Sequence, residues 1–133
     1  MSIHISWLRE GHVILSQVTH MLRVEEMAEA DATFIEMIRA KADNAPMVHI
    51  LVDLREVEKL DAGVHEISRA LSHLREPNMG WTLLVTDNRL IQFVGSIVVQ
   101  VAKARFRAFT DYDEAYAFLM EQDQSLPPLE NAS

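Results

Sequence analysis

The chain has 133 residues, a net charge of -8 and no cysteine. Its length fits one domain with its own core, and 49% apolar with 24% charged residues is typical of a soluble globular protein. The acidic balance argues against nucleic acid as a partner, because phosphate binding needs clustered Lys and Arg. The absence of cysteine excludes disulfides and cysteine metal sites. Since neither a signal-peptide layout nor an apolar run of ~20 residues is present, we expect a cytoplasmic protein without a membrane span.

The chain opens with a predicted hairpin and helix. Apolar and polar residues alternate over residues 3–7, as in a half-buried strand. A turn signal at Glu10-Gly11 then leads into a second expected strand, Val13–Val18. From Val24 the apolar spacing becomes helical, and Pro46 marks the end of that helix.

The clearest strand is the apolar run from Met47 to Val52, whose lack of alternation is typical of a strand covered on both faces. We expect His49, inside this run, to be a core histidine bonded to backbone or to a neighbouring helix. Asp53 stands where the strand should leave the core, at the carboxyl edge where ligands and partners usually bind in open α/β sheets. A solvated, charged loop should then lead to Asp61, the N-cap of a helix running to about Glu76.

The rest of the chain continues the alternation of strands and helices. A strand over residues 81–86 should be followed by a helix over residues 89–103, capped by Asp87 or Asn88. A short strand over residues 105–109 then leads to a last helix, which is capped by Thr110 and ends near residue 121. This order predicts an α/β fold with a mixed, mostly parallel sheet opened by an N-terminal hairpin, and with helices packed on the sheet. Residues 1–121 should form one domain. Residues 122–133, with two prolines and little to bury, should form a flexible C-terminal tail.

This element order, with the segments VHILVDL, LDAG, WTLLVT and RFRAFTDYDEAYAFL, resembles the STAS domain of anti-sigma-factor antagonists and sulphate transporters. It resembles the stand-alone SpoIIAA-like proteins of bacteria more closely, over roughly Ile3 to Met120. The resemblance implies βα turns wound as a superhelix and a regulatory role through protein partners. In the antagonists it also implies a serine that a partner kinase phosphorylates, within an Asp-Ser-Ser/Thr-Gly motif at the start of the helix after the central strand.

The matching segment of this chain, Leu60-Asp61-Ala62-Gly63, departs from that motif, because no Ser or Thr occurs between Leu54 and Ile67. A phospho-switch needs a hydroxyl at the helix N-terminus, where free N–H groups can hold the phosphate. We therefore do not carry the phosphorylation over to this chain. Asp61 places a permanent carboxylate there instead, either as a plain N-cap, which we prefer, or as a mimic of the phosphorylated state.

Catalytic and metal-binding patterns are missing from the sequence. His65-Glu66 begins like the HExxH zinc motif, but Arg69 takes the place of the second histidine. The acids between Asp53 and Asp61 alternate with basic residues, as in a self-neutralised surface. No nucleophile elbow or glycine-rich phosphate loop occurs. We therefore predict no catalytic residue, no metal and no cofactor, and rank a hydrolytic enzyme a distant third.

The helix over residues 89–103 is more apolar than a surface helix should be. Its expected inward stripe consists of Leu90, Phe93, Val94, Ile97, Val98 and Val101. A second apolar stripe consists of Ile91, Gly95, Val99 and Ala102. That second stripe is a self-association surface, the wall of a lipid-like ligand cleft, or plain core. With Asp53, Asp61 and the strand residues Arg105 and Arg107, it makes up the predicted partner or ligand surface.

The leading hypothesis is a non-enzymatic interaction module that forms a homodimer through this helix and the carboxyl edge of the sheet. The alternative is a carrier or sensor of an amphipathic, lipid-like small molecule, held in a cleft under the same helix.

Overall fold

The computed structural model describes residues 3–40, 47–61, 67, 71–102, 105–123 and 126. One sheet holds five strands in the order β1 to β5, in which β1 pairs antiparallel with β2 and all other pairs are parallel. The strands are β1 Ile3–Arg9, β2 Val13–Arg23, β3 Val48–Asp61, β4 Met79–Val85 and β5 Arg105–Phe109. The hairpin and the mixed, mostly parallel sheet are therefore confirmed.

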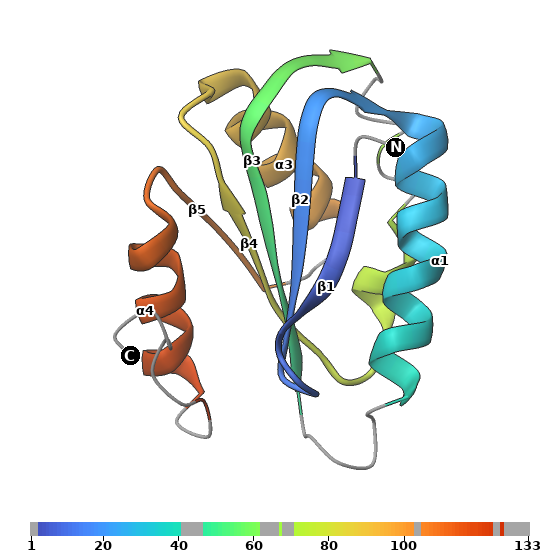
Figure 1. Cartoon of the computed structure of the whole chain (residues 1–133), viewed down its shortest axis with the longest axis vertical. Coiled ribbons are helices and arrows are strands. Elements are labelled where there is room, and N and C mark those ends of the chain that lie inside the picture. Colours follow the sequence, from blue (N-terminus) through green and yellow to red (C-terminus); the bar gives the residue numbers. More distant parts are fainter. Residues whose placement is uncertain are drawn as a thin grey trace.

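Helices cover both faces of this sheet (Figure 1). The helical elements are α1 Val24–Ala40, the short 3-10 helix η1 Ser72–Arg75, α3 Arg89–Ala102 and α4 Tyr112–Gln122. Figure 1 shows α1 and α3 on one face and α4 on the other. The predicted α/β class with helices packed on the sheet is thus confirmed.

Neighbouring residues of the central strands serve two separate cores. Ile50 and Leu84 belong to the core under α1 and α3, whereas Leu51 and Leu83 belong to the core under α4. Successive side chains of a strand point to opposite faces, so a strand buried on both sides has no polar alternation. This burial explains the unbroken apolar run after Met47.

The prediction that β3 ends at Asp53 was wrong, because the strand continues to Asp61. Asp53 lies opposite Val85, the last residue of β4, so beyond that point β3 pairs with β2 alone. The two strands extend past the rest of the sheet, at the top of Figure 1. Leu54 and Val57 are buried there in the α1 core, so this segment is a strand and not the expected solvated loop.

The ends of the helices differ in part from expectation. Asn88 caps α3, as one of the two predicted candidates, since its Oδ1 accepts the N–H groups of Leu90 and Ile91. Asp111 caps α4 in place of Thr110, because its Oδ1 accepts the Asp113 N–H at 2.8 Å. Residues 62–66 and 68–70 of the helix predicted to follow Asp61 lie outside the described residues.

The expected C-terminal tail contributes to the packed structure. Asp123 and Leu126 are both buried, Leu126 in the core under α4. The other residues beyond Asp123 lie outside the described part of the chain.

Candidate functional site

A cavity of about 110 Å³ lies between the sheet and the helical layer formed by α1, η1 and α3. Its walls are mostly apolar, and residues from all three helical elements and from all five strands contribute to them. Representative lining residues are Val18, Phe34, Leu54, Leu74, Leu84 and Ile91. The cavity exists because α1 and α3 flank the sheet while the short η1 lies between them.

Thr82 is the polar residue that stands out on the sheet side of this cavity. Its side chain lies on the same face of β4 as Leu84, and the whole residue is only 6% exposed. Its hydroxyl has no hydrogen-bond partner among the described residues. A buried hydroxyl without a partner is destabilising, so a native protein that retains one calls for an explanation.

Helix α3 faces the sheet with its second stripe, which the sequence left open as a self-association surface, a cleft wall or plain core. Ile91 is only 5% exposed, and a Cβ atom on Gly95 would lie 2.6 Å from Leu84 Cδ1, so both residues face β4. Leu90 and Phe93, expected inside, are each 62% exposed. The expected inward position of Leu90 and Phe93 was therefore wrong, although Val94 of the same stripe does line the cavity.

The lack of a side chain at Gly95 explains this orientation. Gly95 lets α3 approach Leu84 and Phe106 more closely than a larger residue would. Ile91 and Gly95 both line the cavity. The other two members of that stripe, Val99 and Ala102, have side chains outside the described part of the structure.

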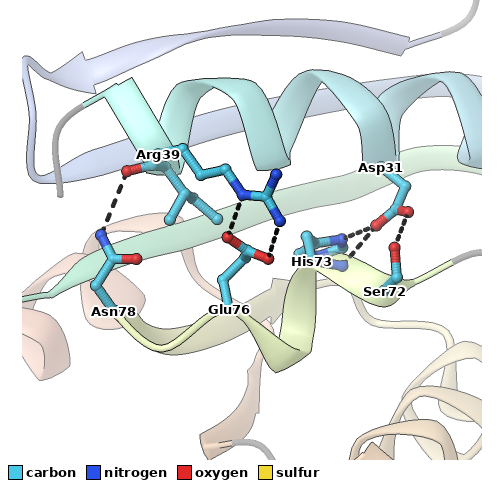
Figure 2. A network of polar contacts seen from close by, with 7 residues as sticks. Asp31, Arg39, Ser72, His73, Glu76 and Asn78 are labelled. Atoms are coloured by element: carbon cyan, nitrogen blue, oxygen red, sulfur yellow. Dashed lines mark hydrogen bonds and ion pairs between the residues drawn. The ribbon is translucent and has the colours of Figure 1, made fainter.

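Asp31, an acid on the buried face of α1, holds η1 in place beside the cavity (Figure 2). The backbone N–H of His73 and its ring Nδ1–H both donate to Asp31 Oδ1, at 2.7 and 2.6 Å. The Ser72 hydroxyl donates to Oδ2 at 2.6 Å. Burial alone would raise the pKa of Asp31, but these hydrogen bonds lower the pKa below its usual value.

A second group of contacts holds the segment after η1 against the end of α1 (Figure 2). The Arg39 guanidinium donates to both carboxylate oxygens of Glu76, at 2.8 and 3.1 Å. The Asn78 amide donates to the carbonyl oxygen of Ile38 at 3.3 Å. Together with Asp31, these contacts fix one wall of the cavity.

His49 lies on the opposite face of the sheet and connects β3 to the end of α4. Its Nδ1 accepts the backbone N–H of Trp81 at 2.9 Å, so its Nε2–H donates to Asp123 Oδ2 at 2.9 Å. Burial lowers the pKa of His49, although Asp123 opposes that shift. The expected core histidine, bonded to backbone and beside a helix, is confirmed.

Asp53, which was predicted at the carboxyl edge, lies on the α4 face, away from the cavity. Asp53 receives two hydrogen bonds from the Arg55 guanidinium, at 2.9 and 2.8 Å, which lower its pKa. The Arg55 guanidinium in turn lies 5.5 Å from the ring centroid of Tyr112 in α4. The structure therefore does not bring Asp53 together with Ile91 and Gly95. The side chain of Asp61 lies outside the described residues.

Arg105 and Arg107 also lie on the α4 side of the sheet, while Phe106 between them lines the cavity. The Arg107 guanidinium lies 5.0 Å from the ring centroid of Phe118. Arg105 donates to the carbonyl oxygen of Met79 at 3.2 Å. These contacts fit edge-strand packing, and the two arginines are not part of the cavity.

The sequence offered a cleft under the helix over residues 89–103 as one alternative, but it did not indicate which polar residues lie beside the cavity. In the sequence, Asp31 is an acid on the apolar face of the helix that begins at Val24. Such a position signals a buried carboxylate that needs partners. His73 and Ser72 supply those partners from η1, but the sequence offers no spacing that would pair residues about forty positions apart.

The described residues hold neither a cluster of metal-binding side chains nor a membrane-spanning helix. No group of three or more His, Cys, Asp or Glu residues there could hold a metal ion. None of the helices in that part of the chain is long and apolar enough to cross a membrane.

Comparison with known proteins gives one family and several structures. A family model described as SpoIIAA-like matches residues 13–120. An uncharacterised protein with a SpoIIAA-like fold from Shewanella loihica PV-4 is 17% identical, with a TM-score of 0.60 over 88% of this chain and 91% of that one. An anti-sigma factor antagonist from Mycobacterium paratuberculosis is 16% identical, with a TM-score of 0.56 over 91% and 93% of the two chains. No curated protein matches.

Proposed function

Because this chain belongs to the SpoIIAA-like family, we propose that it is a regulatory module that works by binding proteins in the cytoplasm and not by catalysis. One structural neighbour is an anti-sigma factor antagonist, a protein named for its effect on another protein. The segment Leu60-Asp61-Ala62-Gly63 lacks a hydroxyl, so the proposed module is not switched by phosphorylation there.

The observation that carries the proposal is the exposed apolar pair Leu90 and Phe93 on α3, which we call the α3 patch. Both residues are 62% exposed. Large exposed apolar side chains that lie together commonly mark a protein interface.

A second copy of the same chain is the partner that the charge distribution favours. The chain has a net charge of -8, so two copies repel each other overall, and an interface between them should hold few carboxylates. Helix α3 has no acidic residue in its sequence RLIQFVGSIVVQVA. Two copies can therefore bring their α3 patches together without placing carboxylates opposite each other, which favours a homodimer.

Light scattering coupled to size exclusion tests this proposal at ~100 µM. We expect the unmodified chain to elute as a dimer, and the double variant Leu90→Glu/Phe93→Glu to elute as a folded monomer, because four carboxylates would meet at the interface. Ala32→Glu, at an exposed position of α1, is the matched control and should remain dimeric. A monomeric unmodified chain would refute the homodimer, and a dimeric double variant would move the interface away from α3.

A second candidate function rests on the cavity. The cavity is mostly apolar and lies under α3, as expected for a carrier or sensor of a small amphipathic molecule. Ile91 and Gly95, from the predicted ligand surface, line it.

Native mass spectrometry of the purified chain tests the second candidate. A bound small molecule should appear as a defined mass increase, and a cavity-filling variant, Ala30→Met, should lose it. Ala30 is buried and lines the cavity, so the larger side chain would occupy ligand volume. Binding that persists in Ala30→Met would place the ligand elsewhere.

A further inference from the structure

We propose that the cavity selects a small, neutral, apolar molecule that carries one hydroxyl group, and that Thr82 Oγ1 is the hydrogen-bonding partner of that hydroxyl. The proposal rests on the second candidate function and adds the chemical class of the ligand. Three features limit the class of ligand: the volume of the cavity, the lack of charge in its lining, and the unpaired hydroxyl of Thr82.

The size of the cavity limits the ligand to about one small ring. The cavity volume is about 110 Å³. A known engineered apolar cavity of ~150 Å³ in another protein binds benzene. Because the two volumes are of the same order, one six-membered ring with at most one small substituent is the largest ligand that we expect to fit, whereas a long acyl chain needs more room than this arrangement of α1 and α3 provides.

The polarity of the lining excludes charged ligands. His73 is the one titratable residue among the described residues of the lining, and its Nδ1–H is already committed to Asp31. A charge placed in such a cavity loses its hydration and gains no opposite charge in return. The ligand should therefore be neutral.

The position of Thr82 sets where the polar group of the ligand binds. Thr82 lies between Ile50 of β3 and Phe106 of β5 in the sheet register, so its nearest neighbours on that face are apolar. Its hydroxyl has no partner among the described residues, although the residue is buried. A ligand hydroxyl at this point satisfies both groups at once, whereas a purely apolar ligand leaves Thr82 unpaired.

Phenol and toluene form a matched pair of probes, because each has seven non-hydrogen atoms and only phenol can form the hydrogen bond. Both are titrated into the full chain by isothermal calorimetry, together with the variants Thr82→Val and Thr82→Ser. We expect Thr82→Val to weaken phenol binding by ~3- to 10-fold and to leave toluene binding unchanged or slightly tighter. Thr82→Ser retains a hydroxyl and should retain phenol binding.

The outcomes separate this proposal from the one on which it rests. Equal effects of Thr82→Val on phenol and toluene would overturn the role of Thr82 while leaving the cavity as a binding site. No binding of either probe to the unmodified chain would overturn the cavity as a ligand site altogether, and would leave the proposed protein module untouched. If Thr82→Val does not fold, the other two variants decide whether the probe occupies the cavity. In that case phenol binding should be lost in Ala30→Met and retained in Thr82→Ser.

Discussion

At the scale of single residues, His49 and His73, which are both buried, perform different structural tasks with the same ring. His49 accepts a backbone N–H at Nδ1 and donates from Nε2 to Asp123, which fixes it as the neutral ring. His73 donates from Nδ1 to Asp31. Each pair connects a helical element to a partner far away in the sequence, so each stabilises tertiary structure.

Gly80 provides the space that His49 occupies. A Cβ atom at position 80 would lie 2.3 Å from His49 Nδ1, a ring that is fully buried and bonded on both nitrogens. We therefore expect Gly80→Ala to lower the free energy of unfolding by about 2–3 kcal/mol, because the ring has no free direction in which to move. Urea denaturation followed by circular dichroism measures this loss.

Gly95→Ala is the matched control for that variant. A Cβ atom there would meet Leu84 Cδ1, the end of a flexible side chain beside the cavity. Alanine also improves helix propensity by ~1 kcal/mol, so we expect Gly95→Ala to be nearly neutral. Equal losses for the two variants would contradict the assigned role of His49.

At the scale of elements, the strands and helices with regular patterns could be predicted and the irregular ones could not. The apolar run of β3 and the long apolar helix α3 are unmistakable in the sequence. The extension of β3 beyond Asp53 could not be predicted from the sequence, because its pairing with β2 shifts register near Thr19 and again near Met21. Such bulges break the two-residue period on which strand recognition depends.

The orientation of α3 could not be predicted from periodicity, because apolar residues cover both of its stripes. Gly95 contributes to this orientation, because its small size lets that stripe pack closely against Leu84. Likewise, the side of the sheet that Asp53 faces depends on its contact with Arg55, which lies beside Tyr112 of α4. Contacts of this kind depend on three-dimensional packing and leave no trace in local spacing.

The attachment of η1 to α1 depends on Asp31, which accepts three hydrogen bonds from His73 and Ser72. We expect Asp31→Asn to lower the free energy of unfolding by about 2–3 kcal/mol, because an amide cannot accept all three bonds and lacks the charge. Hydrogen exchange should accelerate in residues 71–75 before it does in β3. Glu36→Gln, an exposed acid of the same helix, is the control and should change neither quantity. Unchanged exchange over 71–75 would refute the anchoring role of Asp31.

At the scale of the whole molecule, stability should fall on acidification in two stages. Burial lowers the pKa of His49, so the unfolded chain binds the proton first and stability is lost as the pH falls through ~6.5. The pKa values of Asp31 and Asp53 are also lowered, so their contribution is present above about 3.8 and is lost below it.

Urea midpoints measured between pH 7.5 and pH 5 test the first stage. We expect the midpoint of the unmodified chain to decrease over this range, and the decrease to become smaller in His49→Gln, which has no proton to gain there. His20→Gln, at an exposed position of β2, should keep the original slope. A midpoint that stays constant or rises toward pH 5 would show that His49 is not held neutral by burial.

The central claim is that α3 uses one apolar face to close the cavity and the other to bind a second copy. A dilution series of backbone amide NMR spectra from ~500 to ~10 µM tests it most directly, because the spectra locate an interface as well as detect it. We predict concentration-dependent shifts confined to the amides around Leu90 and Phe93, with those of β1 and α4 unchanged. Spectra that do not change on dilution, or shifts centred on the arginines of β5, would contradict the account.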